Sequence, residues 1–527
     1  MSLLPFLLVA FGAGTMSLLT RQRADISGGI GIAGLALAAL AGATALVLER
    51  VGGPLGWGGG APLTDVATIL VLGTLGGLLM VLAGAGPGTV PRSLPGATLM
   101  TLGWAGLALA VGTPQAALVL ATAAGATSLL PMLDTGAASD RGAVGAAVVL
   151  RVTVGAGIVA AIAAAVLTLG PPADGAIPVR IDDAVVGLAL LAVAGAVAAR
   201  LGVIPFHRAA TRLASAAPPS ALPLALIWGP VVFALVAVTW LAPSPIDADL
   251  AVERGIILVC GLAGVLLGTA AALIHDDLEH VLGYAIATDG GIALLAIGAP
   301  AEPVGAAAWT WLLAVAVGRT ALAGWVVAVG GRSGSRRLGD LAGWARRSPA
   351  LAMAFAGATV AAIGWPGSAV FTSRATLASA PLDASFAPAA LAIVLAPSLI
   401  FVRLLVIGLR RPVPAVRDVP GEARTRLRVA TVAALVLAGL GLAVSGGLVG
   451  VRGPEPLLLG GEDPAVDLSV IVDQLVGAEP EGHLGVGSLR PIGRVDQVLG
   501  GLDREVSADR PGRRLVRTRR AVHRADH

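Results

Sequence analysis

Long apolar stretches alternate with short polar stretches up to about residue 451 of the chain. A helix needs about 20 predominantly apolar residues to cross a bilayer. This criterion predicts about fourteen membrane-spanning helices. Short segments that contain Gly, Pro and charged residues, such as GGPLGWGGGAP, separate them. The predicted spans lie near residues 2–20, 27–48, 65–85, 96–112, 115–133, 143–169, 183–204, 220–241, 255–274, 278–298, 304–330, 350–376, 387–409 and 428–450.

The composition excludes an ordinary soluble protein. The chain is 56% hydrophobic and 13% charged, whereas soluble domains are about 25% charged. Its 72 glycines are typical of helices that approach one another closely in lipid. The N-terminal run MSLLPFLLVAFGAGTMSLL has no basic region before it, so we interpret it as a first span and not as a cleaved signal peptide. We therefore expect an all-α polytopic membrane domain over residues 1–451.

Every basic residue other than histidine is an arginine, and the arginines concentrate in alternate loops. Loops rich in Arg face the cytoplasm, so this alternation supports the number of spans. It predicts a multi-pass protein of the cytoplasmic membrane with both termini on the outer face. Arg50, Arg180 and Arg254 are exceptions. The arginine-rich loops lie around residues 21–23, 92, 141, 208–212, 332–347 and 410–428.

The last segment, residues 452–527, differs in character from the rest. It is polar and Gly-rich at first and ends in the basic stretch RPGRRLVRTRRAVHRADH. This composition predicts a largely disordered tail, with a short amphipathic helix near 466–476. Basic residues close to a bilayer can bind anionic headgroups; a solvated tail without a function is the alternative.

A small set of ionisable residues falls inside the predicted spans. Such residues are costly in lipid and usually functional. Asp134 lies near the end of its span. The others are Arg151, Arg200, Asp289, Arg319, Arg374 and Arg403.

Two of these arginines lie beside a predicted helix break. Pro205 follows Arg200, and the GWPGS stretch with Gly364 and Pro366 precedes Arg374. Proline removes a backbone donor and interrupts a helix, and broken helices in corresponding halves of a membrane protein indicate a transport site. The two breaks therefore predict two related halves, over about residues 96–241 and 255–409.

An ionisable residue inside a span does not by itself require a transport role. An arginine near a helix end can extend its charge to the interface, which applies most to Arg151 and Arg403. His207 is more typical of a hydrogen-bonding histidine than of a metal ligand. With Cys260 as the single cysteine, no cluster has metal-ligand spacing, and no nucleotide-binding or nucleophile motif occurs. We expect no metal, no cofactor, no catalytic residue and no nucleic-acid partner.

Four stretches resemble the antiporter-like membrane subunits of proton-pumping NADH:quinone oxidoreductase (the N, M and L type) and of Mrp-type cation/proton antiporters. The first resembles the PFH segment of that family, the second its Leu-x-Tyr segment, the third a loop, and the fourth its broken helix. They are IPFHRAATRLASAAPPSA at 204–221, LIHDDLEHVLGYAIATDGGIALLAIG at 273–298, LGDLAGWARRSPALA at 338–352 and AAIGWPGSAVFTSRATL at 361–377.

The resemblance implies two inverted five-helix repeats, each with a broken helix, and a central line of ionisable groups across the membrane. By position, Arg200 replaces a central lysine of the family and Arg374 its later basic residue. Arg151 corresponds to a lysine of the sixth helix, and Asp289 replaces a histidine. The resemblance thus implies an ion pathway through Arg200, His207, Asp289 and Arg374, and the charges inside the spans add Arg151 and Arg319 to it.

The chain also departs from the family. The acidic residue of the fifth helix has no counterpart, since Gly125 falls about there, and Gly229 and Pro230 fall where the eighth helix has a lysine. The usual aspartate after the PFH segment is replaced near Arg212. A lysine can be tuned to release its proton, whereas an arginine keeps its charge.

Two functions follow as hypotheses. The chain is either a proton- or cation-translocating subunit, moving ions along a central polar axis, or a degenerate, non-conducting structural subunit of the same kind of complex. A stand-alone transporter of another solute is a third, weaker option. The expected partners are the other membrane subunits of a respiratory or Mrp-like complex, the lipid bilayer, and protons or monovalent cations. Any enzymatic role is at most that of a non-redox translocase subunit.

Overall fold

The computed structural model describes residues 3–52, 61–84, 90–134, 140–168, 182–241, 250–299, 302–333, 335–381, 387–411 and 421–453. All of these belong to one compact unit, Met1–Leu458. Within these ranges the structure is helical, and the β-structure is limited to an isolated bridge between Asp277 and Arg337. The predicted tail lies outside the described residues apart from its first two, Arg452 and Gly453.

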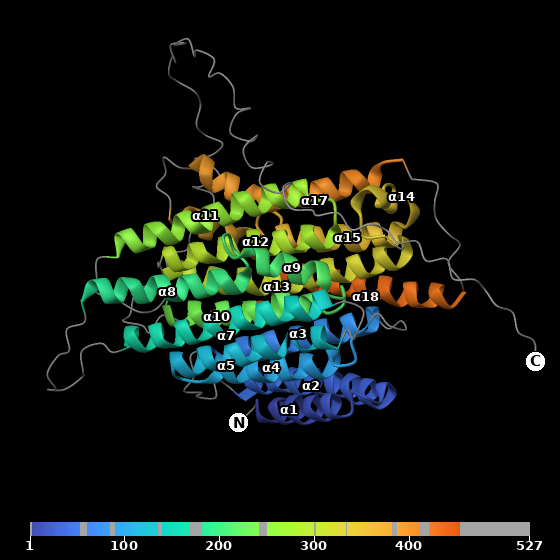
Figure 1. Cartoon of the computed structure of the whole chain (residues 1–527), viewed down its shortest axis with the longest axis horizontal. Helices are drawn as coiled ribbons and strands as arrows, with labels where there is room; N and C mark the ends of the chain where they lie inside the picture. The colour runs from blue at the N-terminus through green and yellow to red at the C-terminus, as the bar shows by residue number, and fades with distance from the viewer. Residues whose placement is uncertain are drawn as a thin grey trace, which may run out of the picture. The chain divides into compact units, whose positions relative to one another are not determined.

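The helices follow the apolar segments of the chain (Figure 1). In the first part of the chain they are α1 (Leu4–Leu19), α2 (Ala24–Gly52), α3 (Leu63–Ala83), α4 (Leu94–Ala110), α5 (Pro114–Thr127), α6 (Leu130–Leu133), α7 (Asp140–Thr168), α8 (Asp183–Leu201), α9 (His207–Ala216), the π-helix η1 (Pro223–Trp228) and α10 (Gly229–Leu241). The second part contains α11 (Ala251–Ile274), α12 (Leu278–Gly298), α13 (Glu302–Ser333), the 3₁₀ turn η2 (Leu338–Leu341), α14 (Trp344–Arg347), α15 (Pro349–Ile363), α16 (Ala369–Ser379), α17 (Ala387–Leu409) and α18 (Gly421–Ser445).

The structure confirms an all-α polytopic membrane protein. In the described ranges, 11 helices are long and apolar enough to cross a membrane, and three shorter apolar helices accompany them: α1, α4 and α15. Every predicted span overlaps one of these helices. The number of membrane crossings and the inverted relation of the two repeats remain predictions.

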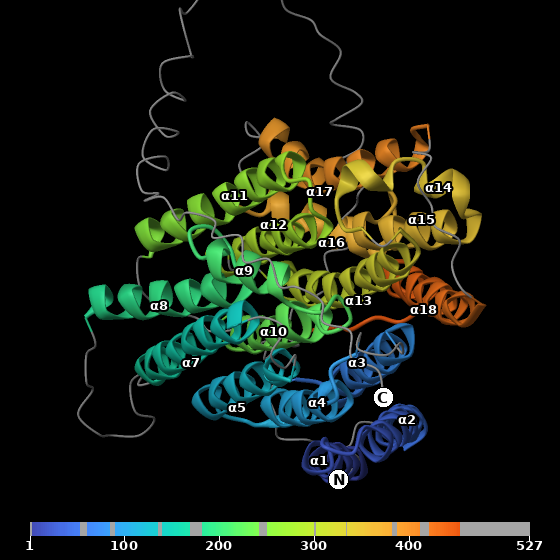
Figure 2. The ribbon, with the colours of Figure 1, turned by 45° about the vertical axis from the view of Figure 1, so that its right-hand side comes forward.

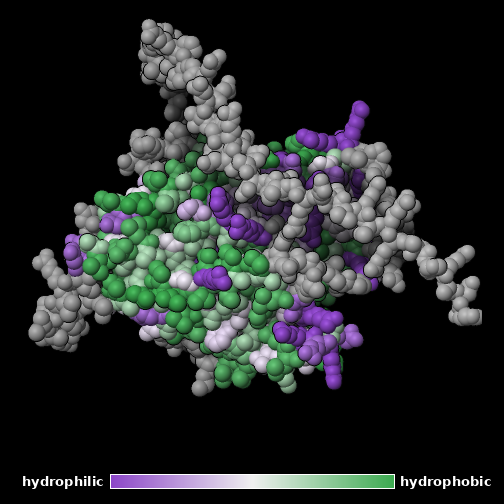
Figure 3. All heavy atoms as spheres, viewed as in Figure 1, coloured by the Kyte–Doolittle hydropathy of each residue, from purple (hydrophilic) through white to green (hydrophobic). Residues whose placement is uncertain are grey.

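Burial separates inner from outer helices. The spans Pro223–Trp240, Leu278–Gly298 and Val304–Ser333 are almost wholly buried, as expected of helices that are apolar all round. α1 and α2 lie at one edge of the bundle, and α11 and α17 lie at the other (Figures 1 and 2). Large apolar side chains such as Leu188 and Val259 are exposed, and they form a broad apolar surface over α7, α8 and α11 (Figure 3). This surface suits contact with lipid.

Two helices are interrupted close to a buried arginine. α8 ends at Leu201, where Gly202 has a left-handed φ of 66°. Residues 202–206, including Pro205, are not helical, and α9 begins at His207. α15 ends at Ile363, and Gly364 (φ 72°) and Gly367 (φ 86°) surround Pro366 before α16 begins. The Ser368 hydroxyl caps α16 by accepting a hydrogen bond from the Phe371 amide.

Candidate functional site: buried charges beside the two helix breaks

Asp289 and Arg319 form a buried ion pair between α12 and α13. Arg319 Nε donates to Asp289 Oδ2 at 2.6 Å, and Nη2 donates to Oδ1 at 2.9 Å. Both side chains are at most 2% exposed. The Arg319 Cζ lies 5.1 Å from the centroid of the Phe401 ring of α17. This two-pronged geometry is the strong form of an arginine–carboxylate contact, and it joins the two most buried helices of the second half.

Arg374 lies next to this pair, on the helix that follows the second break. It is fully buried, and its Cζ lies 5.8 Å from the centroid of the Trp311 ring. It is close enough to interact electrostatically with both Asp289 and Arg319. Its Nε and Nη1 have no hydrogen-bond partner among the described residues. The cluster thus combines two guanidinium groups with one carboxylate, and one positive charge is not balanced within it.

Arg200 forms a separate site in the last turn of α8. It is 7% exposed, donates from Nη1 to the Thr153 hydroxyl of α7, and has its Cζ 5.9 Å from the Phe233 centroid in α10. Its Nε and Nη2 have no partner in the described structure. The guanidinium fills the space that a side chain at Gly125 would need. The position where the sequence lacks the expected acid is therefore in contact with Arg200.

Gly229 of α10 lies beside Gly125 of α5. A Cβ atom on Gly229 would approach the Gly125 Cα to 3.3 Å and the Ser128 hydroxyl to 2.7 Å. Gly125 and Gly229 thus let α5 and α10 pack closely beside the Arg200 guanidinium. At the two positions where the resemblance implies an acid and a lysine, the glycines carry no charge, and the neighbouring atoms leave no space for a larger side chain.

The other predicted residues are more dispersed. Pro205, Gly364 and Pro366 lie in the two non-helical breaks. His207 is partly buried at the start of α9, whereas the Arg151 side chain is exposed on α7. The structure therefore brings Asp289, Arg319 and Arg374 together, keeps Arg200 in a second cluster, and leaves Arg151 outside both.

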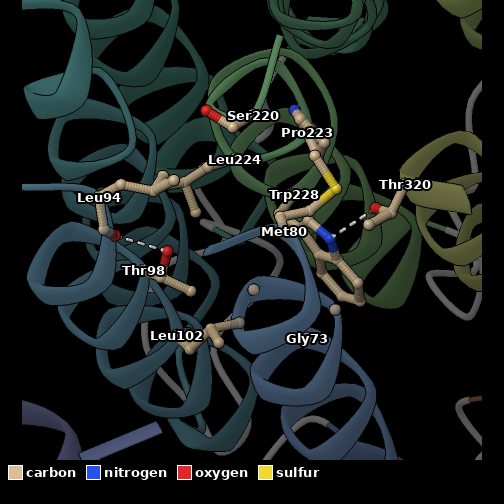
Figure 4. Close-up of a pocket in the computed structure, with 12 residues that line it drawn as sticks. Gly73, Met80, Leu94, Thr98, Leu102, Ser220, Pro223, Leu224, Trp228 and Thr320 are labelled. Atoms are coloured by element: carbon tan, nitrogen blue, oxygen red, sulfur yellow. Dashed lines mark hydrogen bonds between the residues drawn. The ribbon is translucent and has the colours of Figure 1, made fainter. Parts of the chain in front are cut away.

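The helical segment between the two clusters, η1 and α10, is apolar. α10 packs against α5 and α8 on one side and against α12 and α13 on the other, and η1 and α10 contain no ionisable residue. Trp228, at the end of η1, donates from Nε1 to the Thr320 hydroxyl at 3.1 Å. It lines a small, mainly apolar cavity with Gly73, Met80, Leu102 and other residues (Figure 4). Such a cavity holds about one water molecule.

Several contributors could not be identified from single residue types. Thr153, Phe233 and Trp311 contact the buried arginines, but Thr, Phe and Trp inside an apolar span carry no specific signal. Among the described residues, no group of three or more His, Cys, Asp or Glu side chains could hold a metal ion.

The fold and the site define a polytopic membrane protein with buried charges at two helix breaks, and comparison with known proteins shows what part of the chain resembles. Residues 177–400 match the family model described as NADH:quinone oxidoreductase/Mrp antiporter, TM. The chain is 29% identical over 204 residues to NADH-quinone oxidoreductase subunit N 1 of Streptomyces griseus. Over these residues the chain is similar to the antiporter-like membrane subunits of NADH:quinone oxidoreductases and Mrp antiporters.

The extent of these matches differs. The alignment with the Streptomyces griseus protein covers 39% of this chain and 43% of that relative. The chain thus matches less than half of the relative's length. Similar folds occur in the Mrp complex from Dietzia sp. (TM-score 0.67, 20% identity, 85% of this chain and 94% of that one). A chain of respiratory complex I from Thermus thermophilus also has a similar fold (TM-score 0.55, 19% identity, covering 83% of this chain and 97% of that one). At these identities the structural matches show the fold alone.

Proposed function

We propose that the chain is an ion-translocating membrane subunit of a larger complex, and that protons or monovalent cations cross it along the buried charges. The observation that carries this proposal is Arg374, a fully buried cation beside a helix break whose positive charge the adjacent Asp289–Arg319 pair does not balance. A buried charge of this kind is costly. Its retention favours a role in moving ions.

Within this proposal the residues have different tasks. Asp289 is the carboxylate of the cluster and can take up and release a proton. Arg319 and Arg374 keep their charge, so they set the electrostatic potential that Asp289 experiences. Arg200 has the same task in the first half, and His207 lies where the first broken helix resumes. Because Arg151 is exposed, we leave it outside the pathway.

The competing proposal is a structural subunit that conducts nothing. The observation that favours it is the apolar contact between the two clusters, with Gly125 and Gly229 in place of ionisable residues and Trp228 filling the junction. Under this proposal the buried ion pair holds α12 and α13 together and has no further task.

The subunit's setting is part of the same proposal. The structural neighbours come from multi-subunit membrane complexes, an Mrp complex and a respiratory complex I. By analogy, we place this chain among other membrane subunits in a cytoplasmic membrane, with both termini on the outer face. It would bind no redox cofactor itself.

Reconstitution tests the proposal. The purified chain, with any partners that co-purify, is placed in liposomes that contain a pH-sensitive dye, and a membrane potential is imposed. We expect proton flux in the wild type and its loss in Arg374→Ala and Arg200→Ala. Arg151→Ala is the matched control, because it removes an exposed arginine from a span. Assembly and thermal stability are measured on each variant.

The outcomes separate the two proposals. Flux lost in Arg374→Ala, with assembly intact and the Arg151→Ala variant active, supports translocation. Stable assembly without flux in any preparation contradicts translocation and favours the structural subunit.

A further inference from the structure

All three histidines in the described part of the chain meet at one place, around the chain's single tyrosine. The rings of His275 and Tyr284 are stacked with centroids 4.9 Å apart and an interplanar angle of 15°. His280 also stacks on His275, with centroids 5.2 Å apart and an interplanar angle of 13°. His207 contacts Tyr284 at 5.9 Å. These four residues, here called the histidine–tyrosine stack, come from α9, the end of α11, and α12.

The backbone around the stack is held by several hydrogen bonds. Arg403 of α17 donates from Nη1 to the carbonyl oxygens of Ala272 and His275, and from Nη2 to Asp276 at 2.9 Å. The turn also pairs with the segment before η2, because Leu278 N donates to Arg336 O and Leu338 N donates to Asp276 O. The stack is thus a fixed feature at the junction of several helices.

Several charged groups lie close to the stack. His280 Nδ1 lies 3.6 Å from Asp277 Oδ2, and this histidine side chain is 27% exposed. Glu279 is buried and pairs with Arg336 at 3.0 Å. The groups from the packed elements are Arg208 of α9, Asp276 and Asp277 of the turn, Glu279 of α12, Arg336 and Arg337 before η2, and Arg403 of α17.

We infer that the histidine–tyrosine stack is a proton-uptake site, where the chain takes protons from water at its arginine-rich side before they reach Asp289; this inference rests on the proposed function. A neutral imidazole nitrogen accepts a proton from hydronium and leaves water. The imidazolium later releases the proton, so the ring is unchanged after each cycle. The exposed carboxylates of Asp276 and Asp277 draw protons to the site.

The arrangement limits the stack to about one proton at a time. Imidazolium rings that face each other at this separation repel one another, and Arg403 adds a further positive charge. Burial, with the neighbouring His280, lowers the pKa of His275, and burial with Arg208 lowers that of His207. His207 and His275 are therefore mostly neutral at pH 7 and free to accept a proton. Tyr284 precedes Asp289 by five residues on α12, about 7.5 Å along the helix axis, and water carries the proton over this distance.

The test compares His275→Gln/His280→Gln with wild type in the liposome assay between pH 5.5 and 8. We expect the double variant to lose flux at least about tenfold, as for removal of a proton-transferring group, and to lose the inflection of its pH profile. His523→Gln, in the tail outside the described residues, is the matched control. We expect this variant to keep both the flux and the inflection of the pH profile. Thermal stability of each variant excludes misfolding as the cause.

A second measurement does not depend on flux. Histidine-labelled protein in nanodiscs is titrated by NMR, and we expect His280→Gln to raise the pKa of His275 because it removes a neighbouring charge. If the wild type conducts protons and the double variant conducts them equally well with the same pH profile, the uptake site is overturned and the proposed function stands. Absence of wild-type flux overturns the proposed function and the uptake site with it. An unchanged His275 titration in His280→Gln overturns the coupling of the two rings.

Discussion

At the scale of single residues, the protein differs from most membrane interiors in how it carries charge. The buried cations Arg200, Arg319 and Arg374 all keep their protons. Only one of them has a carboxylate partner among the described residues, the Asp289 that binds Arg319 through both oxygens. Within the two clusters, Asp289 is therefore the side chain that can exchange a proton.

The Asp289–Arg319 pair gives a direct prediction for stability. Asp289→Asn leaves the buried Arg319 charge without its partner, and loss of one member of a buried pair costs about 3–5 kcal/mol. We expect a clear decrease in the thermal unfolding midpoint in detergent. In Asp289→Asn/Arg319→Gln neither member of the pair leaves its charge behind, and Arg374 is again the one unbalanced charge of the cluster, so most of the loss should be recovered. Equal midpoints for the single variant and the wild type would show that the pair is not structural.

Residue-scale features were also the hardest to derive from sequence. The buried position of Arg200, Asp289, Arg319 and Arg374 follows from charge inside an apolar span. Their division into two clusters does not, because it depends on which helices pack together. The sequence marks Gly125 as the position of a missing acid, but its contact with the Arg200 guanidinium depends on the packing of α7 against both α5 and α8.

At the scale of helices, the break between α15 and α16 depends on glycine conformation. Gly364 has φ 72°, and a Cβ atom there would lie 2.7 Å from the Phe371 amide nitrogen. We expect Gly364→Ala to destabilise the protein by about 1–3 kcal/mol, because a strained backbone and a backbone clash coincide. The measurement is the thermal unfolding midpoint in detergent.

Two further glycines serve as controls for this prediction. Gly367 has φ 86° but nothing within 4 Å of its Cβ position, and Gly330 has open space without a positive φ. The expected order of destabilisation is Gly364→Ala, then Gly367→Ala, then Gly330→Ala. A Gly364→Ala variant as stable as Gly330→Ala would contradict the described backbone.

The junction of α9, α11 and α12 gives a pH prediction. Burial lowers the pKa values of His207 and His275 below their usual value near 6.5. The unfolded chain then binds more protons than the folded chain, so stability is complete above about pH 6.5 and is lost as the pH falls through that value. The unfolding midpoint between pH 5 and 7.5 should fall less steeply in His207→Gln/His275→Gln. Identical slopes in the two proteins would refute this account.

At the scale of the whole molecule, the length and number of the apolar stretches were enough to predict the class of fold. Each span is marked by about 20 apolar residues, and every predicted span overlaps an observed helix. The order of helices in space was not predictable in this way, since nearly uniform apolar helices carry little information about their neighbours. That α10 separates the two charge clusters follows only from the packing.

One contact links the early and late parts of the bundle. The backbone amides of Arg452 and Gly453 both donate to the buried carboxylate of Asp65, at the start of α3, at 2.9 Å. The ribosome adds Arg452 387 positions after Asp65, a delay of roughly 20–80 s at ordinary rates of translation. The α3 carboxylate therefore obtains these two donors only after the last described helix has been synthesised. A nascent chain that stops before residue 452 lacks them, which gives the cell's membrane proteases a chemical difference between finished and unfinished copies.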